Sequence, residues 1–203
     1  MNRFISTEFI VLRKTAYQES SLIVSGLSPD VGKIDFILKG ARRISKTSFP
    51  EVDYFRVFSV SFYDRNKALI SPTTLELLKT HDALANAPER FTEAFEIVPF
   101  IMRNKHYGVS CPVLYKSLLR YIDSLTNNKR CQQFFIKLAY LYENGLLPED
   151  LAYSQEDQKR NKNFLSLLIN HILNGSEFPA LTREYYLILE KWINSLCLSS
   201  ELC

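Results

Sequence analysis

The spacing of apolar residues changes near residue 80, and this change limits what the chain can fold into. Before that point apolar residues recur at every second position, as in a strand with one buried face. Beyond it they recur about every three and a half positions, as in helices that pack on one side. The sequence therefore predicts an α+β chain of two domains, with strands in residues 1–80 and helices in residues 81–203.

Five strand-like segments precede the change, at residues 7–12, 20–27, 33–39, 54–63 and 68–75. Pro72 interrupts the last segment, and a change of face near Val57 and Phe58 indicates a bulge in the fourth. The early segments are too close together for a crossover helix. We therefore expect an antiparallel meander that closes on itself, that is, a five-stranded OB-fold β-barrel at the amino terminus.

The second part is predicted to be an α-helical bundle of about five helices. Pro88 lies where a helix begins, and Pro99 is expected to kink that helix. Apolar stripes at residues 113–125, 131–142 and 164–173 predict three more helices. Thr182 is expected to cap a last helix that ends at Leu198.

The segment Gly32 to Lys46, GKIDFILKGARRISK, joins a strand-like alternation to a dense basic turn. Ile34, Phe36 and Leu38 share one face of the predicted strand, and Gly40 allows a sharp exit from it. The basic residues that follow are Arg42, Arg43 and Lys46. Arginine grips phosphate through two hydrogen bonds, but a short charge run is also commonly a solvated loop. The charges alone leave both interpretations open.

The longer stretch VLRKTAYQESSLIVSGLSPDVGKIDFILKGARRISK, from Val11 to Lys46, resembles the amino-terminal signature of the bacterial recombination mediator RecO. The matching positions are Arg13, Tyr17, Glu19, Ser20, Ser21, Leu22, Gly32, Lys39, Gly40, Ala41 and Arg42. A weaker match is the helix ending at Gly145, Leu146, Leu147 and Pro148. The resemblance implies the same OB-fold, and together the matches suggest family coverage of most of the chain.

The composition is that of an ordinary globular protein, with 46% hydrophobic and 23% charged residues. No stretch of about 18 uninterrupted apolar residues occurs, and the opening residues are too interrupted for a signal peptide. We expect no membrane association and a cytoplasmic location. The resemblance to RecO further implies association with the bacterial nucleoid.

The formal net charge of +3 is unevenly spread. Residues 1–80 contain twelve Lys or Arg and eight Asp or Glu, whereas residues 81–203 contain thirteen and fourteen. This asymmetry is typical of a nucleic-acid module joined to a packing or partner-binding module.

The cysteines predict no metal site. Cys111, Cys131, Cys197 and Cys203 are scattered, with no pair at zinc-ligand spacing. Many RecO relatives carry a four-cysteine zinc cluster shortly after the position of Gly145, but here that place holds LAYSQEDQKRNKN. The resemblance is therefore to a shortened RecO that lacks the zinc cluster and needs no cofactor.

No catalytic motif stands out. The sequence has no P-loop, no glycine-rich dinucleotide turn and no HExxH, and His81, His106 and His171 are far apart. We expect a protein that binds rather than an enzyme.

The candidate nucleic-acid contacts are basic residues of the barrel and one aromatic residue. They are Arg13, Lys14, Lys33, Lys39, Arg42, Arg43, Lys46, Arg56 and Tyr17. OB barrels combine such a basic groove with aromatic stacking, so Phe36, Tyr54 and Phe58 are further stacking candidates, although most barrel aromatics are expected in the core.

The resemblance implies a mediator of DNA repair and homologous recombination. Such a protein binds single- and double-stranded DNA, promotes strand annealing, and assists RecA loading with RecR on strands coated by single-stranded-DNA-binding protein. The acidic, Phe-ended tail of that last protein would need an apolar pocket beside a basic side chain, for which the candidates are Lys116, Arg120 and Lys137. The alternative is a protein-interaction adaptor whose helical part binds repair partners and whose barrel has little DNA affinity.

Overall fold

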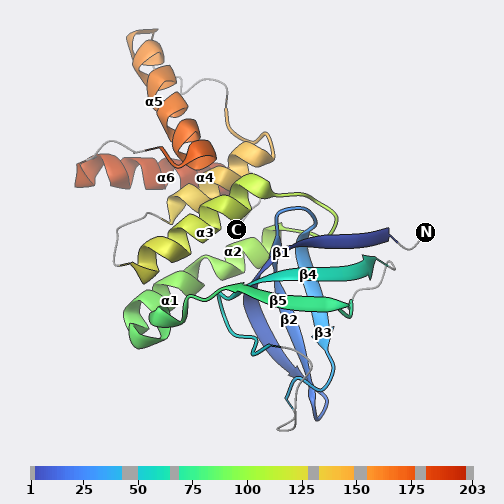
Figure 1. Cartoon of the computed structure of the whole chain (residues 1–203). Helices are drawn as coiled ribbons and strands as arrows, with labels where there is room; N and C mark the ends of the chain where they lie inside the picture. The colour runs from blue at the N-terminus through green and yellow to red at the C-terminus, as the bar shows by residue number, and fades with distance from the viewer. Residues whose placement is uncertain are drawn as a thin grey trace.

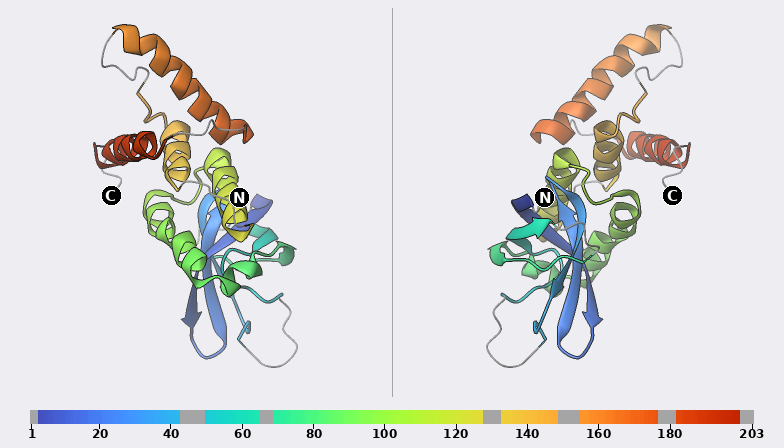
Figure 2. Two further views of the ribbon diagram at one scale, coloured as in Figure 1. Left: turned by 90° about the vertical axis from the view of Figure 1, so that its left-hand side faces the viewer. Right: turned by 90° about the vertical axis from the view of Figure 1, so that its right-hand side faces the viewer.

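The structure is a computed structural model that describes residues 3–42, 50–64, 69–127, 133–148, 155–176 and 182–199. For residues 155–163 and 199 it describes the course of the backbone alone. The strands come first and the helices follow, so the predicted α+β class is confirmed (Figure 1). The β1–β2 turn and helix α5 lie at opposite ends of the molecule in all three ribbon views (Figure 2).

The strands form one sheet in the order β3-β2-β1-β4-β5, and every strand pair in the described ranges is antiparallel. Their bounds are β1 Arg3–Tyr17, β2 Ser21–Ser28, β3 Gly32–Leu38, β4 Val57–Asp64 and β5 Thr74–Lys79. The predicted meander is wrong in one respect, because β4 pairs with β1 and not with its predecessor β3. The predicted bulge is present, since the β4–β5 register shifts between Val57 and Phe58.

The predicted closure of the sheet is wrong in the described residues, because the edge strands β3 and β5 do not pair with each other. An isolated bridge joins β3 to Ile70, ahead of β5. Ile37 N–H donates to the Ile70 carbonyl at 2.9 Å, and Ile70 N–H donates to the Asp35 carbonyl at 3.2 Å. The predicted strand at 68–75 begins later than expected, at Thr74. Pro72 lacks the N–H that a ladder needs, so regular pairing starts only beyond it.

Six α-helices and a 3₁₀ helix follow in the described residues. They are η1 Asp82–Asn86, α1 Pro88–Glu96, α2 Val98–Asn104, α3 Pro112–Thr126, α4 Phe134–Glu143, α5 Gln155–Asn174 and α6 Arg183–Ser199. Pro88, Pro99 and Pro112 each stand in the first turn of a helix, where no N–H is required. Pro99 therefore separates α1 from α2 instead of kinking one helix. Thr182 caps α6 as predicted, its Oγ1 accepting from Tyr185 N–H at 3.4 Å.

Strand β1 is buried on both faces over Phe9, Ile10, Val11 and Leu12. Phe9 and Val11 pack inside the barrel, in one cluster with residues of β2, β3 and β4. Ile10 and Leu12 belong to a second cluster that includes α1, α2 and α3. The helices thus cover the outer face of the sheet. The strands end at Lys79 and η1 begins at Asp82, but the division into two domains at residue 80 stays a prediction.

A strap (residues 50–56) crosses from the sheet to the helices just before β4. Phe55 N–H donates to the Val11 carbonyl at 2.8 Å, and the Phe55 ring packs against Phe95 of α1 at 4.9 Å between centroids. Phe55 has φ of 60°, a left-handed conformation that a non-glycine residue adopts only when its surroundings hold it there.

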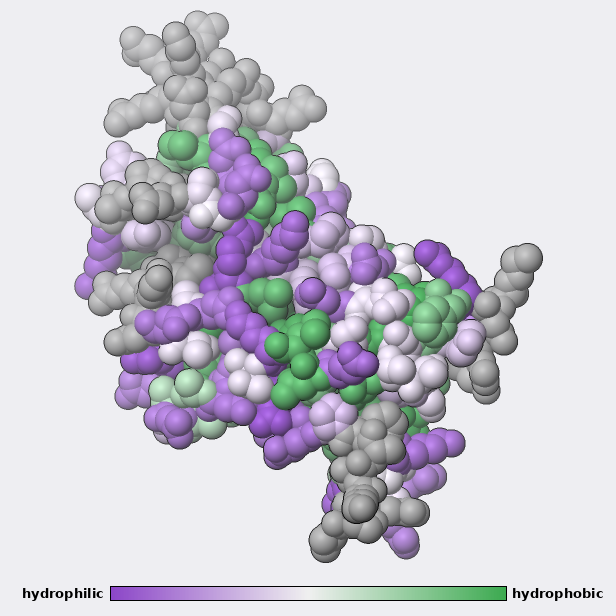
Figure 3. Space-filling view, viewed as in Figure 1, coloured by the Kyte–Doolittle hydropathy of each residue, from purple (hydrophilic) through white to green (hydrophobic). Residues whose placement is uncertain are grey.

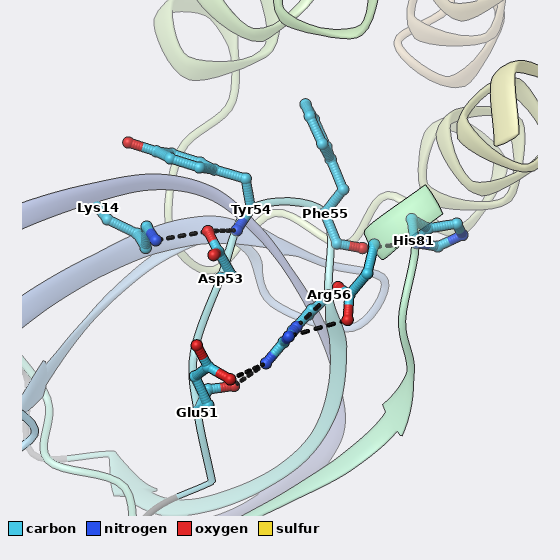
Figure 4. A network of polar contacts seen from close by, with 8 residues as sticks. Lys14, Glu51, Asp53, Tyr54, Phe55, Arg56 and His81 are labelled. Atoms are coloured by element: carbon cyan, nitrogen blue, oxygen red, sulfur yellow. Dashed lines mark hydrogen bonds and ion pairs between the residues drawn. The ribbon is translucent and has the colours of Figure 1, made fainter. Parts of the chain in front are cut away.

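His81 joins the strap to α3, and Figure 4 shows its contact with Phe55. Its Nδ1 lies 2.7 Å from the Phe55 carbonyl oxygen, and its Nε2 lies 2.8 Å from Oδ1 of Asp123 in α3. The same Asp123 oxygen pairs with the Lys79 ammonium at 2.5 Å.

We expect His81→Ala to lower the free energy of unfolding by about 2–3 kcal/mol, because it leaves the buried Phe55 carbonyl without this donor and removes one of the two partners of Asp123. Urea denaturation measures this. His106→Ala is the matched control, since His106 is exposed and its loss should change stability by less than about 0.5 kcal/mol. Equal effects of the two substitutions would show that His81 does not fasten the strap.

Candidate nucleic-acid interface

The carboxyl-terminal half of β1 extends beyond the part that the helices cover. The β1–β2 register shifts between Val11 and Arg13, so a bulge separates the doubly buried segment from an exposed one. Arg13 lies opposite Ser25, and Tyr17 lies opposite Ser21. Arg13 and Tyr17 are four positions apart beyond the bulge, so they share one face of the strand. The residue between their partners that packs inside the barrel is Val24, opposite Lys14. Arg13 and Tyr17 therefore lie on the outer face, where both are exposed.

The chain beyond β3 folds back onto this exposed hairpin. Gly40 has φ of 75°, the left-handed conformation that its sequence position predicted. Arg42 N–H then donates to the Ser20 carbonyl at 3.0 Å, and Arg42 Nη1 lies 3.4 Å from the Gln18 carbonyl oxygen. We call residues 13–21 and 39–42 the basic tip.

The basic tip contains Arg13 and Tyr17 of β1 and Lys39 and Arg42 from the turn beyond β3, and all four are exposed. It lies at the end of the barrel remote from α5 (Figure 1). Hydrophilic side chains lie at this lower end in the space-filling view (Figure 3). Arg43 and Lys46 lie outside the described residues.

Lys14 already has a partner within the chain. Its Nζ lies 2.5 Å from Oδ1 of Asp53 in the strap and 4.5 Å from the centroid of the Tyr54 ring (Figure 4). Burial alone would raise the pKa of Asp53. The hydrogen bonds from Lys14 and from Tyr54 N–H, with the charges of Lys14 and Arg56, hold that pKa below its ordinary value.

Arg56 is held still more closely. Its Nε and Nη2 lie 3.0 and 2.9 Å from the two carboxylate oxygens of Asp82, and Nη1 donates to the Glu51 carbonyl at 2.7 Å. The hydrogen bond to Asp82 raises the pKa of Arg56 despite its burial. Lys33, at the start of β3, donates to the Met102 carbonyl of α2 at 3.1 Å. As nucleic-acid contacts, Lys14, Arg56 and Lys33 stay predictions. Lys14 binds the sheet to the strap, Arg56 binds the strap to η1, and Lys33 binds the sheet to α2.

Two predicted stacking candidates are wrong, because Phe36 and Phe58 are 1% and 0% exposed inside the barrel. The alternation that predicted their strands does not tell which face the barrel closes over. Tyr54 packs edge-on against Phe95, with centroids 4.9 Å apart, while Tyr17 keeps 38% of its surface exposed.

Sequence reasoning also missed an exposed aromatic pair. Phe4 and Tyr63 lie opposite each other on β1 and β4, with centroids 5.2 Å apart and 54% and 45% of their surfaces exposed. The predicted first strand began at Thr7 and so left Phe4 out. Extending the alternation back through Ser6 would have placed Phe4 on the outer face.

The helical candidates do not gather in one place. Lys137 lines a hollow of about 380 Å³ between α2, α4 and α6, which we call the α2–α6 hollow. Phe100, Leu198 and Arg103 also line it, and Lys137 Nζ donates to Oδ1 of Asn194 at 2.8 Å. Lys116 is exposed on α3, and Arg120 donates to the carbonyls of His171 and Ile172 at the end of α5, so neither belongs to that lining.

Cys111 and Cys197 are both buried. Burial raises the pKa of Cys111 to about 12, and its Sγ lies 3.2 Å from the Ser28 carbonyl oxygen. Within the described ranges no group of three or more His, Cys, Asp or Glu residues is arranged to hold a metal ion. Cys131 and Cys203 lie outside those ranges. No helix in the described part of the chain is long and apolar enough to cross a membrane.

Comparison with known proteins agrees with this geometry. The family model described as recombination protein O N terminal matches residues 1–81, the region of the sheet. The DNA repair protein RecO of Idiomarina loihiensis is 27% identical over 123 residues, which cover 61% of this chain and 52% of that protein. The chain thus spans about half the length of the relative that it matches. The part of the chain that forms the sheet, with the ordered residues from Arg13 to Arg42, thus matches the amino-terminal domain of the RecO family.

Proposed function

We propose that the basic tip binds the phosphates of single- and double-stranded DNA, and that the chain serves DNA repair and recombination by bringing complementary strands together. The match to the RecO family supports the role in repair and recombination. The observation that carries the proposal is the tip itself, where the side chains of Arg13, Lys39 and Arg42 and the ring of Tyr17 are all exposed.

The mechanism we propose is charge neutralisation. Two DNA strands repel each other, and cationic side chains that replace their counterions allow them to approach and anneal. Tyr17 offers a face for stacking an unpaired base, which is sequence-tolerant because every base has such a face. No bond is made or broken in this scheme, so the protein acts as a binder and not as an enzyme.

We further propose the family's partnerships for this chain: RecR, single-stranded-DNA-binding protein and, indirectly, RecA, at the bacterial nucleoid. The α2–α6 hollow is the part of the surface that supports a tail contact. Phe100 and Leu198 offer an apolar wall, and Lys137 and Arg103 offer cations for a terminal carboxylate.

A protein-interaction adaptor remains the second candidate, because the same hollow would serve it without any DNA. Titration with a fluorescent single-stranded oligonucleotide at several salt concentrations separates the two. The mediator binds, and its affinity falls as salt rises; the adaptor does not bind.

We expect Lys39→Ala with Arg42→Ala to weaken single-stranded DNA binding and to flatten the dependence of log affinity on log salt by about 1.4, or roughly 0.7 for each lost phosphate contact. The loss should be similar for oligonucleotides of different sequence, since phosphates carry no base information. The matched control is Arg183→Ala with Lys191→Ala, which removes two exposed charges from α6. If both double variants behave like the wild type, the basic tip is only a solvated turn.

Asp53→Asn should raise affinity for the same oligonucleotide, by up to about fivefold, because Lys14 then loses its carboxylate partner and becomes available to a phosphate. Glu184→Gln on α6 makes the same charge change away from the barrel and should have no effect. The lowered pKa of Asp53 means that its pairing stabilises the fold at neutral pH, and that this contribution is lost as the pH falls through the folded-state pKa. Asp53→Asn should remove that part of the acid sensitivity. Unchanged DNA affinity would show that Lys14 does not face DNA.

An acidic peptide that ends in Phe should bind the α2–α6 hollow, and Phe100→Ala or Lys137→Ala should each weaken it by about tenfold. Lys116→Ala, on an exposed position of α3 outside the lining, is the control and should leave binding unchanged. Fluorescence anisotropy with a labelled peptide measures the three. Loss of binding in the Lys116 variant alone would move the tail site to the outer face of α3.

A further inference from the structure

A second hollow, of about 240 Å³, lies where α2 ends and the chain turns toward α3. Three basic side chains line it from nearly consecutive positions, Arg103, Lys105 and His106, with Tyr140 of α4 opposite. None of the described residues in its lining is acidic. We call it the basic hollow.

Lys105 is a buried cation with incomplete pairing. The residue is 2% exposed, and its Nζ lies 3.9 Å from Oε2 of Glu143, too far for a hydrogen bond. Among the described residues this ammonium has no hydrogen-bond partner. The reason is that Glu143 is held elsewhere, since its Oε1 accepts from Val113 N–H at the start of α3 at 2.8 Å. The ammonium lies 5.0 Å from the centroid of the Tyr140 ring.

The basic hollow sits against the barrel at the far end of β3 from the basic tip. Gly108 N–H donates to the Val31 carbonyl at 2.8 Å, so the loop after α2 is docked on the β2–β3 turn. Gly32 makes this approach possible: it has φ of 72°, and a Cβ there would lie 2.5 Å from the His106 carbonyl oxygen. Lys33 reaches Met102, the residue before Arg103. Cationic side chains thus stand at both ends of β3.

The span between the two ends fits one nucleic-acid strand. The seven residues of β3 cover about 23 Å at roughly 3.3 Å per residue. OB folds contact about 4–16 nucleotides of single strand, so a strand that runs along β3 from the basic tip arrives at the basic hollow within that length. Arg103 and His106 are exposed there.

We infer that the basic hollow holds a backbone phosphate of the same single strand that the basic tip binds, so that the helical part contributes a second DNA anchor. This inference rests on the proposed function. An acidic peptide that ends in Phe fits the neighbouring α2–α6 hollow better than the basic hollow. Its apolar side chain would pack against Phe100 and Leu198, which line the α2–α6 hollow and do not line the basic hollow. Cations at the end of α2 also stabilise the helix, so the test must read DNA binding and not stability alone.

The test compares a single-stranded oligonucleotide of about 6 nucleotides, which occupies one end of β3, with one of about 20, which reaches both. Arg103→Gln with His106→Gln should weaken the longer probe by about threefold to tenfold, flatten its salt dependence by about 0.7 per lost phosphate, and leave the shorter probe unchanged. Arg183→Gln with Lys191→Gln on α6 is the matched control. Urea denaturation confirms that both variants are folded.

The outcomes are distinct. If the wild type binds neither probe, the proposed function and this inference fail together. If it binds both and the variant binds the longer probe as tightly as the wild type does, the inference fails alone. A variant that loses only the acidic Phe-ended peptide assigns Arg103 to the α2–α6 hollow and overturns the phosphate site.

Discussion

Burial of β1 on both faces is the constraint on which the rest of the structure depends. Phe9 and Val11 pack in the interior of the barrel, while Ile10 and Leu12 pack against α1, α2 and α3. Burying a large apolar side chain contributes about 1.5–3 kcal/mol, so neither face can be opened without a large loss of stability. The barrel and the helices therefore share the middle of one strand, and the part of β1 beyond the bulge, from Arg13 onward, is left exposed for a ligand.

This division explains why basic residues of the barrel have two roles. Arg56 pairs with Asp82, Lys14 pairs with Asp53, and Lys33 binds a helix end, so their charges join the sheet to the strap and the helices. The exposed cations of the basic tip have no such structural task among the described contacts beyond the long one from Arg42 to Gln18. A count of positive charges in residues 1–80 therefore overstates the surface available to DNA.

Much of the fold could be predicted because the spacing of apolar residues within a segment shows whether that segment is a strand or a helix. Ile34, Phe36 and Leu38 alternate, and β3 begins and ends within one residue of the predicted strand. Which strands pair with each other could not be predicted in this way. The pairing of β4 with β1 and the bridge from Phe36 to Ile70 join segments distant in sequence, and periodicity carries no information about which edges meet.

The candidate site was predictable to the same extent and for the same reason. Lys39 and Arg42 are near neighbours in sequence, so the turn at Gly40 sufficed to place them together. The contact of Lys14 with Asp53 joins residues 39 positions apart, and no local sequence pattern predicts it. Nor does any motif mark Arg103, which lines both the α2–α6 hollow and the basic hollow. If a peptide carboxylate and a DNA phosphate each take this one guanidinium, the two ligands oppose each other's binding, and by linkage each weakens the other by the same factor.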